Sequence, residues 1–162
     1  MLRPISRALS YSVKNLPTSL ISARERGLPI DLHPEVEQAL VDCQPLVALE
    51  TTIITHGMPY PVNLETAKSV ERHVRSAGVI PATIGVIGGR VKIGLETAQL
   101  EYLADSRANT STGPVKLSRR DIAAAIASKK DGGTTCSATL IFAALAGIKV
   151  SVGLHVVIDK EF

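Results

Sequence analysis

The chain has 162 residues, a length that fits one domain and leaves little room for two independent cores. Hydrophobic residues make up 45% of it and charged residues 20%, as in an ordinary α/β protein, whereas aromatic residues make up 3%. With no Trp and two Phe, it offers few rings on which single-stranded nucleic acid could stack. No apolar run reaches the roughly 18 residues of a membrane-spanning helix, so neither nucleic acid nor a membrane is an expected partner.

The net charge of +3 is concentrated at the N-terminus. Of the 18 basic and 15 acidic side chains, residues 1–28 carry five and one, so the remainder is close to neutral. The basic character therefore belongs to a leader and gives no reason to expect nucleic-acid binding by the globular part. A leader rich in Arg and Ser and poor in acids is typical of a mitochondrial transit peptide. We expect mitochondrial import; the alternative is a disordered leader on a cytoplasmic protein.

The first predicted elements are a helix, a strand and a longer helix. Folded structure is expected to begin near Ile30, and Pro34 marks the start of a short helix over "PEVEQAL". A strand is predicted over 45–52. A stronger amphipathic helix is expected to begin at Asn63, a good N-cap, and to end at Gly78.

The second half of the chain continues the alternation. "VIPATIGVI" predicts a buried strand that closes in a turn at "GG", followed by a helix over 97–104 and a loop over 106–113. "SRRD" resembles a capping box that leads into a helix, "DGGTT" predicts a loop, and "CSATLIFAALA" predicts a helix that ends at Gly147. "IKVSVGLHVVI" has the pattern of a last strand. The order favours an α/β fold with a substantially parallel sheet.

A carboxylate interrupts the first strand pattern. In "LVALETTIITHGMPYP", Glu50 follows four apolar residues, and an unpaired buried carboxylate is costly. Ligand sites in open α/β sheets gather beyond the carboxyl ends of strands, where an acid with a raised pKa could donate a proton. Alternatively, the alternation points Glu50 to solvent on an edge strand. His56, in the loop that follows, is either an acid/base group or a hydrogen-bonded structural residue.

Two later segments have the composition of anion sites. "KLSRRD" places Lys116, Arg119 and Arg120 at a helix start, where cations oppose the helix dipole unless they meet an anion. They form either a phosphate cradle or a set of solvated surface charges. "DGGTTCSAT" opens the next helix with two glycines and with hydroxyls that could hold a phosphate or a ring carbonyl.

The two cysteines do not suggest a disulfide or a zinc site. Cys43 and Cys136 lie far apart and neither has CxxC spacing. No activating base is visible beside Cys136, which favours a small buried residue.

Four segments taken together resemble the pseudouridine-5′-phosphate glycosidase family. They are "VALETTIITHGMPYPVNLETA", "GVIPATIGVIGGRVKIGL", "VKLSRRDIAAAIA" and "GGTTCSATLIFAALAGIKV", in family order from about Ile30 to Val150. The resemblance implies a three-layer α/β/α fold with a largely parallel or mixed sheet, and homotrimers. It implies reversible cleavage of the C–C bond of pseudouridine 5′-phosphate to uracil and ribose 5-phosphate, with Mn²⁺ and a lysine Schiff base.

The same resemblance assigns roles to residues. Glu50 matches the family's proton donor in the motif "ALE[ST]TII[ST]HGMP", and Lys116 matches its substrate-binding lysine. Cys136 occupies a substrate-contact position where the family often has Val, and Thr134 and Thr135 beside it are weaker substrate-binding candidates.

The resemblance stops near Val150. The metal-holding aspartate and the Schiff-base lysine of the family lie beyond that point, and Asp159 and Lys160 sit in no matching motif, so the sequence assigns no metal ligand. We therefore divide the chain into a leader over 1–28, the N-terminal part of a glycosidase domain over 29–150, and a divergent tail over 151–162. This division predicts a sheet that is incomplete at its C-terminal side. It also leaves an alternative to the enzyme: a truncated isoform without turnover, or a phosphosugar-binding fragment.

Overall fold

The computed structural model describes residues 16–105 and 113–152. Most of the predicted loop over 106–113 and of the tail over 151–162 lies outside these residues. The elements in chain order are α2 Thr18–Glu25, β1 Ile30–Leu32, α3 Pro34–Val41, β2 Leu46–Leu49, the π-helix η1 Ile53–Gly57, α4 Val62–Ser76, β3 Ile80–Ile87, β4 Arg90–Ile93, α5 Thr97–Ala104, β5 Val115–Leu117, the 3₁₀ helix η2 Arg119–Asp121, α7 Ile122–Ala127, β6 Gly132–Thr134, α8 Cys136–Ala146 and β7 Val150–Val152.

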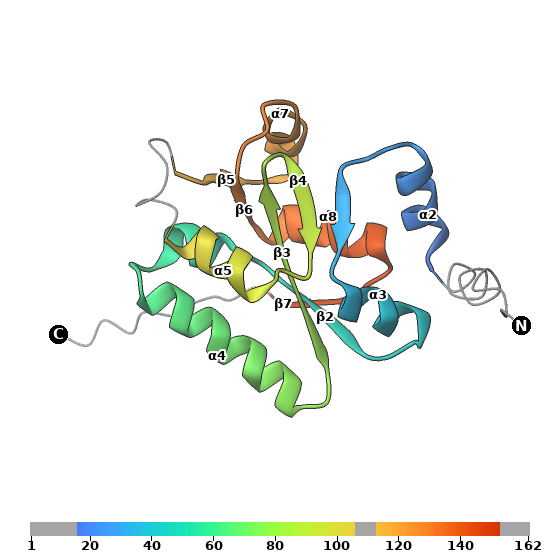
Figure 1. The fold of residues 1–162 in the computed structure, drawn as a ribbon, viewed down its shortest axis with the longest axis horizontal. Coiled ribbons are helices and arrows are strands. Elements are labelled where there is room, and N and C mark those ends of the chain that lie inside the picture. Colours follow the sequence, from blue (N-terminus) through green and yellow to red (C-terminus); the bar gives the residue numbers. More distant parts are fainter. Residues whose placement is uncertain (1–15, 106–112, 153–162) are drawn as a thin grey trace, which may run out of the picture.

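The strands form one mixed sheet in the order β1-β4-β3-β2-β7, with β6 beside β3 and β5 beside β6 (Figure 1). β2 runs parallel to the first half of β3, from the pair Leu46–Ile80 to the pair Leu49–Thr83. β6 runs antiparallel to the second half and pairs with Gly85 and Val86. Both strands therefore run toward Ile84 along the same edge of β3, and the residues after their carboxyl ends meet there.

Two cores lie on the two faces of β3. Its even-numbered residues Ala82, Ile84 and Val86 join a core with side chains of α2 and α8, among them Leu20 and Phe142. On the odd-numbered face, a methyl group on Gly85 would meet Leu95 and Leu103, which belong to a second core with α4 and α5. The expectation of an α/β fold with helices on both sides of a mixed sheet is confirmed.

Most of the predicted elements are present, with shifts at their ends. The helices that begin at Pro34, Thr97 and Cys136 lie where expected, and Gly147, with φ = 77°, is the C-cap that terminates α8. The N-cap of α4 is Pro61 rather than Asn63, because Asn63 lies inside the first turn and donates to the carbonyl oxygens of Ile54 and Ala104 instead. Asn63 thus joins three segments of the chain.

The structure corrects two expectations about extent. Folded structure begins by Leu16, the first described residue, because Leu16, Leu20 and Ala23 are buried in the core with α8. Residues 16–28 are therefore not a disordered leader. The segment "DGGTT" is also not simply a loop, since Gly132–Thr134 pair with β3 and β5; three-residue strands rich in glycine have too little side-chain pattern to be recognised.

Candidate active site

Glu50 and Cys136 meet where the carboxyl ends of β2 and β6 converge. Glu50 follows the last residue of β2, and Cys136 is the first residue of α8, two positions after β6. The thiol of Cys136 donates to Oε2 of Glu50 at 2.9 Å. Glu50 is half-buried and Cys136 is exposed, so the pair lies at the surface with access to solvent. Of the two alternatives for Glu50, the structure favours a carboxylate at a strand end over an outward residue of an edge strand.

A buried group of threonines fixes this convergence. The backbone N–H of Thr134 donates to Oγ1 of Thr51 at 2.8 Å, and the N–H of Thr51 donates to the carbonyl oxygen of Thr134 at 3.2 Å. Both hydroxyls also donate to the carbonyl oxygen of Ile84, at 2.8 and 2.7 Å. Thr139 donates to Thr134 Oγ1 from inside α8 at 2.9 Å. Thr51, Thr134 and Thr139, which we call the threonine clamp, hold the start of α8 against the end of β2.

The clamp corrects the prediction for Thr134. Its side chain is 0% exposed, and its hydroxyl already donates to Ile84 and accepts from Thr139. It positions the site and does not face a ligand. Thr135 differs: it is half-buried as the N-cap residue of α8, its N–H donates to the carbonyl oxygen of Leu117, and its hydroxyl lies 3.1 Å from that of Ser137.

The two glycines of "DGGTT" are required by close packing. A methyl group on Gly133 would lie 2.1 Å from Oγ1 of Thr55 and 2.9 Å from the carbonyl oxygen of Thr51. A methyl group on Gly132 would lie 2.3 Å from Cδ1 of Leu117. The glycines let β6 approach η1 and β5. Close packing therefore explains the two glycines of "DGGTT", which the sequence also allowed as part of a phosphate site.

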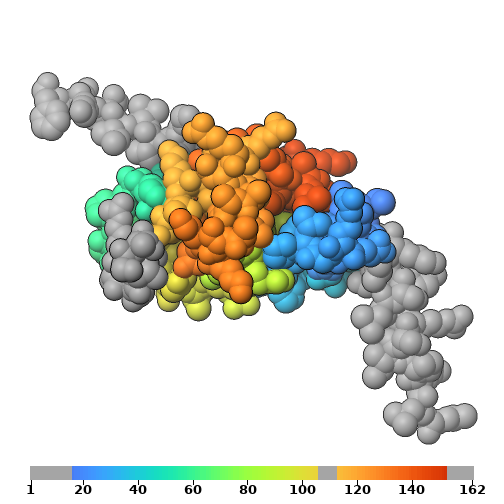
Figure 2. Space-filling model, turned by 90° about the horizontal axis from the view of Figure 1, so that it is seen from above, coloured from blue at the N-terminus to red at the C-terminus, as the bar shows by residue number. Residues whose placement is uncertain are grey.

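The basic segment lies beside the start of α8. Lys116 is exposed on β5, in register with Gly133 of β6, while Arg119 and Arg120 lie on η2. The N–H of Arg119 donates to Oγ of Ser137 at 3.3 Å, which joins η2 to the first turn of α8. Ser118, Arg119, Arg120 and Ser137 line an open hollow of about 470 Å³. In the space-filling view, the orange segment that contains β5, η2 and α7 covers the middle of one face (Figure 2).

The predicted capping box is present. The N–H and the hydroxyl of Ser118 both donate to Oδ2 of Asp121, at 3.0 and 2.5 Å. These bonds lower the pKa of the Asp121 carboxyl. The Asp121 carboxylate is bound to Ser118 and makes only a distant contact with Arg120, 4.0 Å from Oδ1 to Nε. The side chain of Arg120 is therefore largely exposed.

The environment of Cys136 differs from the sequence prediction of a small buried residue with no base nearby. Its thiol is exposed and accompanied by a carboxylate; the hydrogen bond to Glu50, followed by partial burial, raises its pKa. A raised pKa keeps the thiol protonated at neutral pH, so Cys136 acts as a donor rather than as a nucleophile. His56 lies on η1, and its Nδ1 is 2.7 Å from Oγ1 of Thr55, the residue that packs against Gly133. This hydrogen bond fits the structural alternative for His56.

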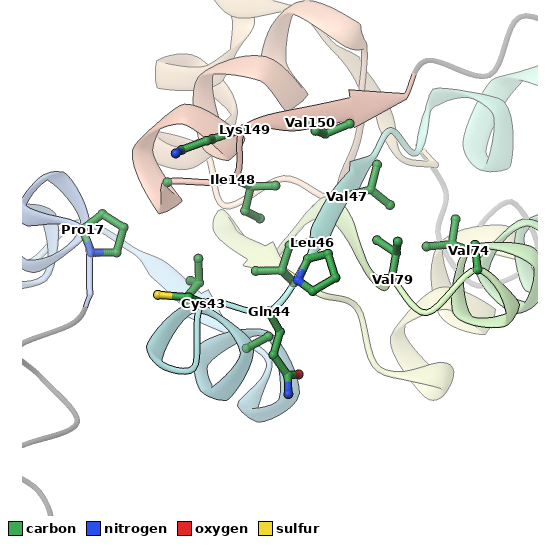
Figure 3. Close-up of a pocket in the computed structure, with 15 residues that line it drawn as sticks. Pro17, Cys43, Gln44, Leu46, Val47, Val74, Val79, Ile148, Lys149 and Val150 are labelled. Atoms are coloured by element: carbon green, nitrogen blue, oxygen red, sulfur yellow. The ribbon is translucent and has the colours of Figure 1, made fainter.

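An apolar groove lies away from these residues. It measures about 640 Å³ and is lined mainly by apolar side chains at the opposite end of β2 from Glu50. Pro17, Cys43, Leu46, Val74 and Ile148 border it, from the N-cap of α2, the α3–β2 connection, β2, α4 and the segment before β7 (Figure 3). It offers few polar groups to orient a phosphorylated sugar.

Metal ligands do not gather in the part of the chain that the structure describes. No group of three or more His, Cys, Asp or Glu side chains there is arranged to hold a metal ion. The Glu50–Cys136 pair alone is too small a donor set for Mn²⁺, which prefers several oxygen ligands. No described helix is both long and apolar enough to cross a membrane.

Sequence reasoning missed the residues that build the site. Thr51, Thr52, Thr55 and Thr139 all carry hydrogen bonds at the convergence of β2 and β6. The repeated threonine pairs after each strand, "ETT" and "GTT", were the available signal. The bonds that join the two pairs, Thr52 with Thr134 and Thr51 with Thr134, span 82 and 83 residues of sequence, so the pairing needs the topology.

Comparisons with known proteins identify relatives of this chain. The profile of a family described as Indigoidine synthase A like protein matches residues 35–156. A pseudouridine-5′-phosphate glycosidase of Paracoccus denitrificans is 57% identical over 121 residues, which are 75% of this chain and 39% of that protein. One of Jannaschia sp. is 54% identical over 123 residues, 76% of this chain and 39% of that protein. The chain thus spans well under half the length of these relatives.

Solved structures show the same fold. An indigoidine synthase A-like protein of Thermotoga maritima superposes with a TM-score of 0.65 at 27% identity, over 76% of this chain and 38% of that one. The prealnumycin C-glycosynthase AlnA, in complex with ribulose 5-phosphate, superposes with a TM-score of 0.64 at 38% identity, over 75% of this chain and 37% of that one.

Proposed function

The chain belongs to the indigoidine synthase A-like family, in which its relatives are pseudouridine-5′-phosphate glycosidases, and from this premise we propose that it serves the same reaction. The reaction is reversible cleavage of the C–C bond of pseudouridine 5′-phosphate to uracil and ribose 5-phosphate. The observation that carries the proposal is the Glu50 carboxylate, held where β2 and β6 converge beside the N-terminus of α8.

Glu50 has the chemistry that the bond cleavage needs. When the bond between the sugar and the base breaks, its electron pair stays on the ring carbon of uracil, which must gain a proton. A carboxyl group at that carbon supplies the proton as a general acid and removes it in the reverse direction. Oε1 of Glu50 has no recorded partner among the described residues, while Oε2 is held by Cys136, so one oxygen can face the base.

The basic segment suits the phosphate end of the substrate. Lys116, Arg119 and Arg120 bring positive charge next to the first turn of α8, whose N–H groups favour anions. The neighbour AlnA, solved with ribulose 5-phosphate, shows that a related chain takes a pentose phosphate. We assign Lys116 to substrate binding, with Thr135 and the start of α8 as further contacts.

Turnover is tested by incubating the chain with pseudouridine 5′-phosphate and Mn²⁺ and measuring uracil by chromatography. The family activity predicts uracil release that Glu50→Gln abolishes. Glu65→Gln is the matched control, because Glu65 is an exposed carboxylate in the first turn of α4 and forms no hydrogen bond with Glu50 or Cys136 among the described residues. Uracil release that survives in Glu50→Gln would contradict the role of Glu50.

A second candidate is phosphosugar binding without turnover. It is favoured by the donor set, because neither a metal-ligand cluster nor a lysine in contact with Glu50 is present among the residues described. The described residues do not fit the Mn²⁺ or the lysine Schiff base that the resemblance implies. Binding of ribose 5-phosphate by calorimetry, together with no uracil release, would select this candidate.

Homotrimer assembly and mitochondrial import are proposals that come with the resemblance and with the composition of the leader. The basic, acid-poor composition of residues 1–28 supports import, although α2 is part of the folded core. Imaging of the chain fused at its C-terminus to a fluorescent protein tests import. Light scattering on the purified chain tests the trimer.

A further inference from the structure

We propose that Cys136 is the positioning residue that holds the Glu50 carboxylate in its working orientation. The inference rests on the proposed function for the role of Glu50, but the contact itself is independent of turnover. Cys136 donates to Oε2 of Glu50 at 2.9 Å, across 86 positions of sequence. A thiol in this place was not expected to have a carboxylate partner.

The contact is built into the scaffold. The threonine clamp fixes the backbone on both sides: Thr51 follows Glu50 directly, and Thr134 lies two residues before Cys136. Thr52 adds a further bond from its hydroxyl to the carbonyl oxygen of Thr134 at 2.9 Å. Because both backbones are held by buried bonds, the thiol and the carboxylate meet without the ordering cost of two long surface side chains.

The thiol is the one donor recorded for Glu50 in the described ranges. The ion pairs found there join other carboxylates to Arg or Lys, and none includes Glu50. Without Cys136, the carboxylate would have no donor from residues 16–105 and 113–152 to fix its rotation. Its oxygens would then sample several directions toward the substrate.

A thiol suits this task better than a cation would. A Lys or Arg partner would hold Glu50 as an ion pair and stabilise its charged form strongly. A thiol is a weak donor, so it can orient one oxygen while the group remains able to exchange a proton. It also leaves the second oxygen of Glu50 available for the base.

The first test measures thiol reactivity. The chain is treated with iodoacetamide at a fixed mildly alkaline pH, and the alkylation rates of Cys136 and Cys43 are followed by mass spectrometry. Glu50→Gln removes the charge that keeps the thiol protonated, so Cys136 should react several-fold faster than in the unmodified chain. Cys43, exposed at the far end of β2, is the internal reference, and Glu65→Gln is the control variant. An unchanged ratio of the two rates in Glu50→Gln would overturn the proposal.

The second test follows the NMR signal of the Glu50 carboxylate itself. It needs the Glu50→Gln variant only to assign that signal. The side-chain ¹³C signal of Glu50 is compared in the unmodified chain, Cys136→Ser and Cys136→Ala. We expect the signal to move in Cys136→Ala and to return toward its original position in Cys136→Ser, which keeps a donor. The same shift in both variants, or no shift in either, would overturn the positioning role. Because neither test needs turnover, failure of the glycosidase proposal would show separately.

Discussion

Gly133 lies so close to Thr55 that a methyl group on it would stand 2.1 Å from the hydroxyl oxygen of Thr55. The same methyl group would lie 2.9 Å from the carbonyl oxygen of Thr51. Rotation of the Thr55 side chain would therefore remove only part of the clash. This approach brings η1 onto β6 and thereby places Glu50 beside α8. The glycine therefore belongs to the architecture of the site rather than to a flexible loop.

Gly133→Ala should destabilise the chain by about 1–3 kcal/mol, the usual cost of overpacking a tight interior. Urea denaturation followed by circular dichroism measures it. Thr55→Ala removes the nearest atom, so the double variant should lose less than the sum of the two single variants. Partial recovery is expected because the carbonyl oxygen of Thr51 stays in place. Strict additivity would show that the predicted clash does not limit stability.

Thr134→Val should cost about 1–3 kcal/mol of stability, because it leaves buried polar partners unsatisfied at nearly constant volume. The hydroxyl of Thr134 donates to Ile84 and accepts from Thr139, and the side chain is 0% exposed. The free energy of unfolding in urea is the measurement. Thr66→Val is the control, because the hydroxyl of Thr66 makes a weak 3.8 Å contact with the sulfur of Met58. Equal losses of stability in the two variants would show that the hydrogen bonds of the threonine clamp do not stabilise the fold more than a weak contact does.

The sequence predicted the local parts of this site and not their assembly. Glu50 at a strand end and Cys136 at a helix start follow from hydrophobic patterning and turn residues within short windows. The approach of β6 to η1 depends on pairing with β3 between residues far apart in the chain, which no local pattern records. For the same reason, the burial of Thr134 and the packing role of Gly133 could not be distinguished from a phosphate loop by composition alone.

Acid should weaken the attachment of β1 to β4 through Asp31. The hydrogen bond from Arg90, with a further bond from Lys92, holds the pKa of Asp31 well below its ordinary value. A carboxyl whose pKa is lower in the folded state stabilises the fold above its unfolded pKa, and this contribution is lost as the pH falls below about 4. Asp31→Asn should therefore destabilise the chain at neutral pH and flatten the fall in stability under acid. The group is partly exposed, so about 0.5–1 kcal/mol is expected from urea titrations across pH.

The exposed edge of β7 should promote self-association. Val150 and Val152 are 56% and 46% exposed on a strand that pairs with β2 alone among the described strands, and Leu140 on α8 is 53% exposed. Exposed apolar edges are templates for pairing with another chain. Val152→Lys places a charge on that edge and should lower the scattering intensity at high protein concentration, whereas Val62→Lys, on the exposed start of α4, serves as the control. Equal effects of the two charges would point to general solubility rather than to the edge.

Lys116→Ala should weaken binding of ribose 5-phosphate about tenfold, which corresponds to one charge-assisted bond to phosphate. Lys116 is exposed on β5 in register with Gly133, which brings its ammonium within reach of a phosphate at the start of α8. None of the ion pairs between described residues includes Lys116. Calorimetric titration with ribose 5-phosphate gives the affinity, and thermal denaturation checks that the fold is intact. Lys130→Ala is the matched control, because Lys130 is also exposed but follows α7 at the opposite end of β6 from α8. Similar losses of affinity in both variants would mean that ribose 5-phosphate binding depends on the overall charge of the chain. Lys116 would then have no specific part in binding.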